Sequence, residues 1–467
     1  MAESPYELIP YPNFPRLATH PDRLAAVGKL FGMQPAPLEN CRVLEIGCGD
    51  GANLIPMACA LPRSRFVGVD LAAEPVAAGM RMAADLELGN LALHAADLRD
   101  IGAGWGEFDY ILAHGVYSWV PEDVREGLLA LCRDHLSPEG IAFISYNAQP
   151  GGHVRQMIRE MLQHHTRHAQ SAAETVRLAR EFLQLLKRSR LLPESWQKQR
   201  DEEVDALLDR PDGALYHDEL GEYNQRFYFR EFAAAARRHG LEYLGEAEPH
   251  GMFDPTRALA GFEGDIVERE QYMDFLKARR FRQTLLCRAE RPLRRETSPE
   301  QMREFLFSAP GRRLENGQIE GARGVCINTR NEAAIGVATA LGEVYPLPLP
   351  FADLVPYAGS MDVLSQMMYE LTIVGFVDLH VFDFPCQDSV TERPRASRLV
   401  RYQAARSCYV TSACHISLQL DEGARRLVGL LDGTRTQREI AAALKLKSTR
   451  ELAAPLEWLA SRGLLEG

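Results

Sequence analysis

Short apolar segments alternate with amphipathic segments along residues 41–147. The apolar segments have the length of buried strands, and they occupy residues 42–47, 65–70, 91–97, 108–115 and 140–147. The segments between them repeat apolar residues at helical spacing, over residues 52–61, 74–88 and 122–136. Strands that alternate with helices of roughly 10 to 15 residues predict a parallel sheet with helices on both faces and right-handed crossovers. The expected fold class of this part is therefore α/β.

The pattern changes after residue 150. Residues 153–210 keep helical periodicity but are rich in Arg, Gln and Glu, which predicts a helical insertion or lid. Residues 227–250 then read as a helix, a terminating glycine and a strand, and residues 281–289 read as a further strand. This strand pair would complete a seven-stranded sheet whose last strand is antiparallel.

The C-terminal third has a third pattern. Residues 362–382 and 452–467 each read as a helix, a glycine and an apolar strand, and each follows a shorter helix. This order predicts an α+β, winged-helix-like region. Because neither unit carries a basic recognition face, we favour a packing or partner-contact module over a DNA reader. The expected domains are an N-terminal cap (1–40), a core (41–150), a helical insertion that completes the sheet (151–290) and winged-helix-like modules (295–467).

Composition narrows the function classes. The 467 residues carry a net charge of −11, which argues against nonspecific binding to nucleic acid or to anionic membranes. No apolar run reaches the ~18 residues that span a bilayer, and the N-terminus lacks a secretory signal pattern. Nine cysteines are scattered without paired spacing, so we expect reduced thiols, a cytoplasmic location and no metal site.

The sequence VLEIGCGDG (43–51) places three glycines directly after an apolar strand. Glycine permits a sharp turn and close approach of a ligand to the backbone. The spacing differs from the GxGxxG dinucleotide fingerprint, and the absence of GK[ST] excludes a phosphate-binding P-loop. Glu45 and Asp50 would repel a pyrophosphate, and they suit a cationic ligand that carries an amino group and a ribose.

Acidic or polar residues also follow the next strands. Asp70 ends the second strand and can accept both ribose hydroxyls, whereas Asp97 and Leu98 follow the third strand and suit an adenine amino group. His114 ends the fourth strand. Ligands of open α/β sheets bind at the carboxyl ends of strands, so this ordered set is more specific than the glycines alone.

These motifs resemble those of class I S-adenosylmethionine-dependent methyltransferases, which have a Rossmann-like seven-stranded fold. Together with YPNFPRLATHPDRLAAVGKLFGM, FDYILAHGVYSWVP, SYNAQPGG and LYHDELGEYNQRFYFREF, they are similar to bacterial methyltransferases with a methyltransferase regulatory domain, over residues 6–290. That group includes enzymes that methylate lysines of outer-membrane proteins. One departure is Gly152, where an aromatic residue is expected, so substrate specificity does not carry over.

The resemblance implies S-adenosyl-L-methionine as the cofactor. The expected cofactor-binding residues are Glu45, Gly47, Cys48, Gly49, Gly51, Asn53, Asp70, Leu71, Asp97, Leu98 and His114. An amine acceptor must lose its proton before it accepts a methyl group. The expected catalytic residues, near the strand ends or in the N-terminal cap, are His114, Tyr117, Tyr146, Asn147 and His20. Trp119, Tyr11 and Arg23 are further candidates for contact with the methionyl carboxylate or the acceptor.

We therefore expect methyl transfer by in-line displacement to an amine of a protein or peptide, with lysine favoured. The alternatives are a small-molecule or carboxylate acceptor, a cofactor-sensing regulator and a degenerate binding pocket. Protein, peptide or small-molecule acceptors are the expected partners, without nucleic acid or membrane insertion. The sequence leaves the oligomeric state open, with a homodimer among the alternatives.

Overall fold

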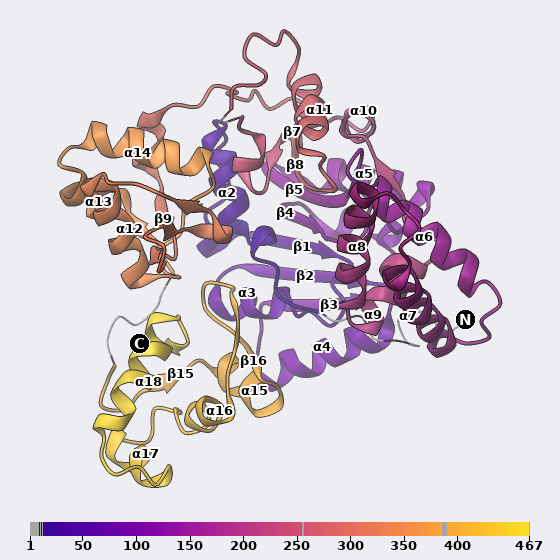
Figure 1. Ribbon diagram of the computed structural model, residues 1–467. Helices are drawn as coiled ribbons and strands as arrows, with labels where there is room; N and C mark the ends of the chain where they lie inside the picture. The colour runs from indigo at the N-terminus through magenta and orange to yellow at the C-terminus, as the bar shows by residue number, and fades with distance from the viewer. Residues whose placement is uncertain (1–8, 10, 12, 255, 385–389, 467) are drawn as a thin grey trace.

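The central feature of the computed structural model is a mixed β-sheet in the order β3-β2-β1-β4-β5-β8-β7 (Figure 1). The structure describes residues 9, 11, 13–254, 256–384 and 390–466, so part of the expected N-terminal cap lies outside the described residues. The strands are β1 (Arg42–Ile46), β2 (Arg65–Asp70), β3 (Leu91–Ala95), β4 (Phe108–Ala113), β5 (Leu136–Ala148), β7 (Leu241–Glu246) and β8 (Phe281–Arg288). A two-residue strand, β6 (Arg226–Phe227), pairs beside the end of β5.

The pairing confirms the Rossmann-like seven-stranded fold expected from the sequence. Strands β1 to β5 pair in parallel, whereas β8 runs antiparallel to both β5 and β7. The central strands carry continuous apolar stretches, in which Leu112, Phe143 and Ile144 are completely buried. A sheet covered on both faces needs such continuous apolar strands.

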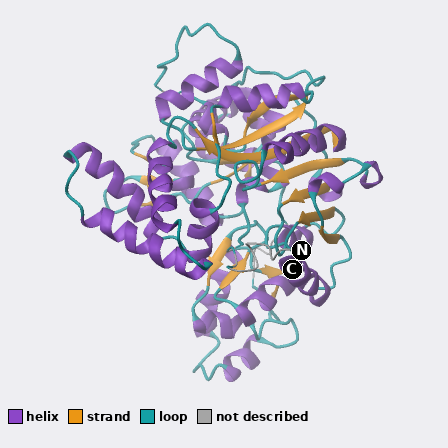
Figure 2. Ribbon diagram, turned by 90° about the vertical axis from the view of Figure 1, so that its right-hand side faces the viewer, coloured by secondary structure: helices purple, strands orange, loops and turns teal. Residues whose placement is uncertain are grey.

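Helices cover the two faces of this sheet (Figure 2). They are α2 (Pro21–Leu30), α3 (Leu54–Ala60), α4 (Ala73–Asp85), α5 (Glu122–His135), α10 (Phe229–Arg238) and α11 (Ile266–Lys277). Their boundaries follow local signals. Helix α2 has Pro21 in its first turn and the His20 side chain as its N-cap, and α10 is followed by Gly240 at φ 70°.

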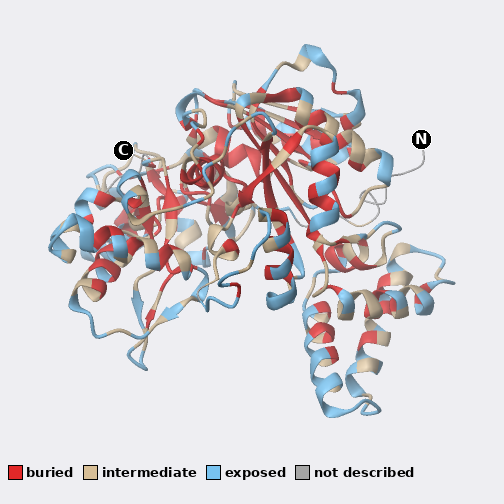
Figure 3. Cartoon of the chain, turned by 90° about the horizontal axis from the view of Figure 1, so that it is seen from above, coloured by how far each residue is buried: buried red, intermediate tan, exposed pale blue. Residues whose placement is uncertain are grey.

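The helical insertion forms a unit of its own beside the sheet. It contains α6 (His153–Thr166), α7 (Ala172–Arg188), α8 (Glu194–Leu208), α9 (Asp212–Leu215) and a π-helical turn (Tyr216–Leu220). Ile158, Leu162, Leu183 and Leu207 form its small buried core. Figure 3 shows that buried residues concentrate around the central sheet, while the peripheral helices expose their outer faces.

The chain after residue 295 forms two α+β units. The first contains α12 (Glu332–Val344), α13 (Phe351–Ala358), α14 (Met361–Ile373), a sheet of β9 (Leu306–Ser308), β13 (Leu349–Pro350) and β14 (Asp378–His380), and short strands β10 (Arg312–Arg313), β11 (Ile319–Glu320) and β12 (Cys326–Ile327). The second contains α15 (Arg398–Arg406), α16 (Glu422–Val428), α17 (Gln437–Ala443), α18 (Arg450–Ser461), and the strand pairs β15 (Arg395–Ala396) with β18 (Leu465–Glu466) and β16 (Tyr409–Thr411) with β17 (Ser417–Gln419).

Both units contact the domain that contains the central sheet rather than only each other. The buried Asp22 carboxylate of α2 accepts hydrogen bonds from the backbone of Val381 and Phe382 and lies 2.6 Å from His380 Nδ1. In the second unit, Tyr402 of α15 donates to Asp85 at the end of α4 (3.0 Å). Among the described residues, no helix combines the length and apolar character needed to cross a membrane.

Candidate active site

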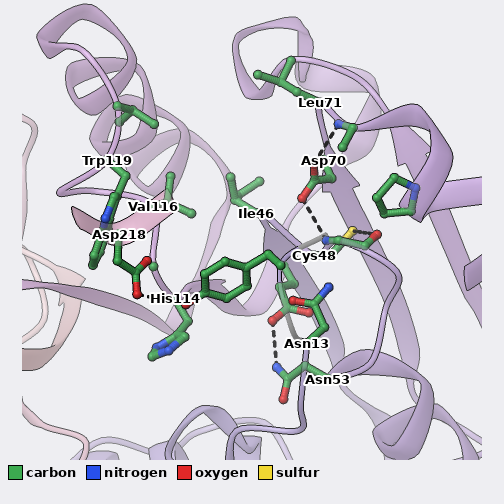
Figure 4. A pocket seen from close by; sticks show the side chains of 18 of the residues that line it. Asn13, Ile46, Cys48, Asn53, Asp70, Leu71, His114, Val116, Trp119 and Asp218 are labelled. Carbon is green, nitrogen blue, oxygen red and sulfur yellow. Dashed lines mark hydrogen bonds between the residues drawn. The ribbon is translucent and has the colours of Figure 1, made fainter. Parts of the chain in front are cut away.

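A cavity of about 1380 Å³ opens at the carboxyl ends of β1, β2, β3, β4 and β5. Its walls come from three parts of the chain: the strand ends and following loops, the N-terminal segment (Tyr11, Asn13, Phe14 and Arg16), and the helical insertion. Figure 4 shows Asp70 and Leu71 on one side of the cavity, and His114, Trp119 and Asp218 on the other. The cavity is larger than the ~300–1,000 Å³ typical of small-molecule sites, so it has room for a donor and part of an acceptor.

The glycine bend forms the floor of the cavity. Gly47 and Gly49 have φ angles of 76° and 55°, a left-handed conformation that other residues adopt only with strain. A Cβ atom on Gly47 would lie 2.8 Å from Val116, and one on Gly49 would lie 2.1 Å from the Asn13 amide. The bend therefore requires glycine for its backbone angles and for the close approach of neighbouring groups.

Glu45 is a buried acid at the end of β1 with half of its carboxylate unpaired. Its Oε1 accepts a hydrogen bond from Asn53 Nδ2 (2.7 Å), whereas Oε2 has no hydrogen-bond partner among the described residues. Burial raises the pKa of Glu45 to about 8. A buried, unpaired acceptor that lines a cavity is a binding position for a hydrogen-bond donor, and an amino group fits it.

Asp70 and Asp97 line the same cavity, as expected. Asp70 Oδ2 accepts from the backbone of Gly49 and Oδ1 from that of Ala72, both at 2.8 Å. A carboxylate has about four acceptor sites, so Asp70 can still bind two hydroxyl groups. Asp97 is paired with Arg99 at 2.7 Å, which lowers the pKa of Asp97. Leu71 is exposed at 72%, as befits a residue at the rim.

His114 lies at the end of β4 and is neutral at physiological pH. Burial lowers the pKa of His114 to about 4. Ser145 Oγ lies 3.1 Å from His114 Nδ1 and accepts from the backbone of Gly115, which holds the ring in place. Asn147 also lines the cavity, and its side-chain amide donates to Asn224 of the insertion (2.9 Å).

Four expected site residues do not line the cavity. Tyr146 is fully buried in the core, stacked on Phe232 at 4.2 Å, and Tyr117 packs among the same aromatic rings. His20 is 1% exposed and serves as the N-cap of α2, and Gly51 is buried and does not line the cavity. We correct the direct roles expected for these residues, because a group that contacts substrate must reach the cavity. Arg23 likewise forms a salt bridge with Asp378 instead (2.6 Å).

Several cavity residues were not expected from the sequence. Asn13 and Arg16 come from the N-terminal segment, and the Arg16 guanidinium has no carboxylate within 4 Å among the described residues. Asp218 and Glu219 come from the π-helical turn of the insertion. The acidic HDEL sequence at 217–220 was a signal of unusual local chemistry, but its distance along the chain gave no reason to place it at the strand ends.

Three exposed histidines lie at the end of α6 or just after it. His164 and His165 of α6 and His168, which follows the helix, are exposed on the surface of the insertion. Within the described part of the chain, no group of three or more His, Cys, Asp or Glu residues is arranged to hold a metal ion.

Three family models match this chain in the order of its domains. A methyltransferase domain matches residues 43–140, a predicted methyltransferase regulatory domain matches residues 211–288, and the PKMT C-terminal winged helix domain matches residues 392–454. Uncharacterized protein RP789 of Rickettsia prowazekii is 30% identical over 94% of this chain and 85% of its own length. Uncharacterized protein RP028 of the same organism is 36% identical over 51% of this chain.

A solved structure agrees with these matches over the full length. PKMT2 from Rickettsia typhi superposes with a TM-score of 0.84 at 28% identity, and the match covers 98% of this chain and 100% of PKMT2. The same protein has also been solved in complex with AdoHcy, the product of methyl donation by S-adenosylmethionine. The chain therefore belongs to the class I methyltransferases that carry the methyltransferase regulatory domain and the PKMT winged-helix domain, and it is an S-adenosyl-L-methionine-dependent methyltransferase.

Proposed function

We propose that the protein transfers a methyl group to the side-chain amine of a lysine in a protein substrate. The observation that carries this proposal is a partner-free carboxylate oxygen and an aromatic ring on the insertion side of the cavity. Glu219 pairs with Arg155 through Oε1 (2.9 Å), but its Oε2 is buried without a hydrogen-bond partner among the described residues, and the Trp119 ring lines the same cavity. An acidic, aromatic wall suits a cationic amine. PKMT2 from Rickettsia typhi, which this chain matches over its full length, supports the same acceptor class.

Glu45, Arg16, Asp70 and Asp97 would hold the donor. Glu45 would bind the donor's amino group through Oε2, and Arg16, whose guanidinium has no carboxylate partner in the described part of the chain, would bind the donor's methionyl carboxylate. Asp70 would accept from the ribose hydroxyls, and Asp97 with Leu98 would border the adenine. Bound S-adenosylmethionine supplies a methyl group that is already activated on a sulfonium. The protein therefore contributes mainly position and water exclusion.

Asp218 would remove the proton from the acceptor amine. Burial raises the pKa of Asp218, which makes its carboxylate a better proton acceptor than an ordinary aspartate. Tyr11 donates to Asp218 Oδ2 at 3.4 Å and Arg210 pairs with the same oxygen, which fixes the carboxylate at the cavity wall. The neutral His114 ring and the Asn147 amide would orient the acceptor between Asp218 and the donor site.

Methylation of a bacterial lysate tests the acceptor class. The protein is incubated with methyl-labelled S-adenosylmethionine and lysate protein, and a second sample uses the same lysate after acetylation of its amines. We expect acid-stable label in the protein fraction, recovered as N-methyl lysine after hydrolysis, and none after acetylation. Label in the small-molecule fraction, or base-labile label typical of a methyl ester, would refute lysine as the acceptor.

A further inference from the structure

The hairpin of β16 and β17 in the second C-terminal unit reaches the wall of the donor cavity. His415 lies in the turn of this hairpin and is 2% exposed. Its Nε2 atom lies 2.9 Å from Oδ1 of Asn53, a cavity residue that precedes it by 362 positions. Figure 1 shows this unit beside α3 and α4. A residue of the winged-helix domain thus contacts the donor site directly.

The hydrogen bonds around Asn53 determine which way its amide points. Oδ1 accepts from the backbone N–H of Arg16 at 2.8 Å, so the amide cannot be reversed without placing two donors together. Nδ2 must then face Glu45 Oε1, to which it donates at 2.7 Å. Because Asn53 Oδ1 is an acceptor, His415 Nε2 must carry the proton. Asn53 therefore links the C-terminal domain to the carboxylate at the end of β1.

The position of His415 is fixed by its own unit. It has a φ of 60°, and its backbone N–H donates to Ser412 O at 3.0 Å within a tight turn. The first residue of the hairpin, Tyr409, packs its ring against Phe14, another cavity residue, at 6.1 Å. Two separate contacts therefore join one hairpin to the cavity wall, and Arg398 forms a salt bridge with Glu87, just after the end of α4.

We propose that His415 is a positioning residue of the methyl-donor site, which the C-terminal winged-helix domain thereby completes. The imidazole fixes the Asn53 amide, and the amide fixes the Glu45 carboxylate so that its free oxygen faces the cavity. This inference rests on the proposed role of Glu45 in donor binding. It gives the C-terminal domain a part in cofactor affinity besides any contact it makes with a protein substrate.

Calorimetric titration of the full chain with S-adenosylhomocysteine tests this proposal. His415→Asn keeps a residue that tolerates positive φ but removes the Nε2 donor, whereas His415→Gln places an amide N–H near the same position. Loss of one hydrogen bond predicts that His415→Asn raises Kd about fivefold. His415→Gln should recover most of the affinity. Ser417→Ala, at an exposed position of the same hairpin, is the matched control and should leave Kd unchanged.

A double-mutant cycle separates action through Asn53 from general loosening of the fold. In an Asn53→Ala background, His415→Asn should change Kd less than twofold, because the link from His415 through Asn53 to Glu45 is already absent. Equal effects in both backgrounds would overturn the proposal. If Glu45→Gln weakens binding but His415→Asn does not, only this inference fails; if Glu45→Gln has no effect, the proposed donor site itself fails.

A measurement on the unaltered histidine covers the case in which His415→Asn fails to fold. Selective ¹⁵N labelling of histidine in the full chain should show His415 neutral, with its proton on Nε2. That signal should shift in Asn53→Ala. A proton on Nδ1, or a signal that does not respond to Asn53→Ala, would overturn the proposed link from His415 through Asn53 to Glu45.

Discussion

Glu45→Gln should stabilise the free protein while it weakens donor binding. Burial raises the pKa of Glu45 from 4.5 to about 8 in the folded chain, so the folded state holds a proton that the unfolded chain has lost. Stability associated with this group is therefore lost as pH rises from 4.5 to 8. At pH 7, keeping Glu45 protonated costs the folded state roughly 3 kcal/mol relative to the unfolded chain, in which its pKa is 4.5. Glutamine has nearly the same shape, keeps Oε1 as the acceptor for Asn53 and carries no titratable proton.

Denaturant unfolding followed by tryptophan fluorescence measures this difference. Two of the four tryptophans, Trp105 and Trp119, lie in the sheet domain, so part of the signal reports on the unit that contains Glu45. Without cofactor, we expect the unfolding free energies of Glu45→Gln and wild type to agree near pH 4.5. They should then diverge by about 1.4 kcal/mol per pH unit, with the variant more stable. Glu39→Gln, at an exposed position, is the control and should show no divergence.

The same variant should bind S-adenosylhomocysteine about 10 to 100 times more weakly at pH 8, because a charge-assisted hydrogen bond is lost. A stability difference that stays constant from pH 5 to pH 8 would show that Glu45 is already ionised in the free protein. The argument from burial would then be wrong. If Glu45→Gln shows the expected gain in stability but unchanged affinity, the burial argument holds and only the binding role of Glu45 is refuted.

Three further outcomes follow from the same groups. Binding of S-adenosylhomocysteine at pH 7 should release protons, because an amino cation favours the ionised form of Glu45, whose pKa is about 8. Calorimetry in buffers of different ionisation enthalpy measures this proton release, and Glu45→Gln should abolish it. Burial lowers the pKa of His20 to about 4, so stability should be lost as pH falls from 6.5 to 4. His20→Asn keeps an N-cap acceptor and should reduce this loss of unfolding free energy by up to about 3 kcal/mol. An unchanged pH dependence of the unfolding free energy would contradict the assignment. Asp218→Asn should lower kcat about 100-fold and leave the KM for S-adenosylmethionine unchanged, because it acts on the acceptor; a change confined to that KM would place Asp218 at the donor instead.

Some errors in the expected site could have been avoided from the sequence. Side chains alternate between the two faces of a strand. Ser145 contacts His114 and Asn147 lines the cavity, so Tyr146 between them points to the opposite face, where it stacks on Phe232. The aromatic character of Tyr146 suggested function, but its position in the alternation assigned it to the core.

The sequence by itself determined the sheet, its antiparallel last strand and the acids at the strand ends. Those features depend on local periodicity and on the order of strands, both of which are written in consecutive residues. Glu45, Asp70 and Asp97 meet in one cavity because the carboxyl ends of parallel strands lie at the same edge.

Only the tertiary structure decided which distant segments close that cavity. Arg16 comes from the N-terminal segment, Asp218 from the insertion and His415 from the C-terminal domain. The contact of His415 with Asn53 joins residues 362 positions apart, and it depends on how whole units pack rather than on any local pattern. Burial also emerges only in the packed fold, and it is burial that raises the pKa of Glu45 and lowers that of His114.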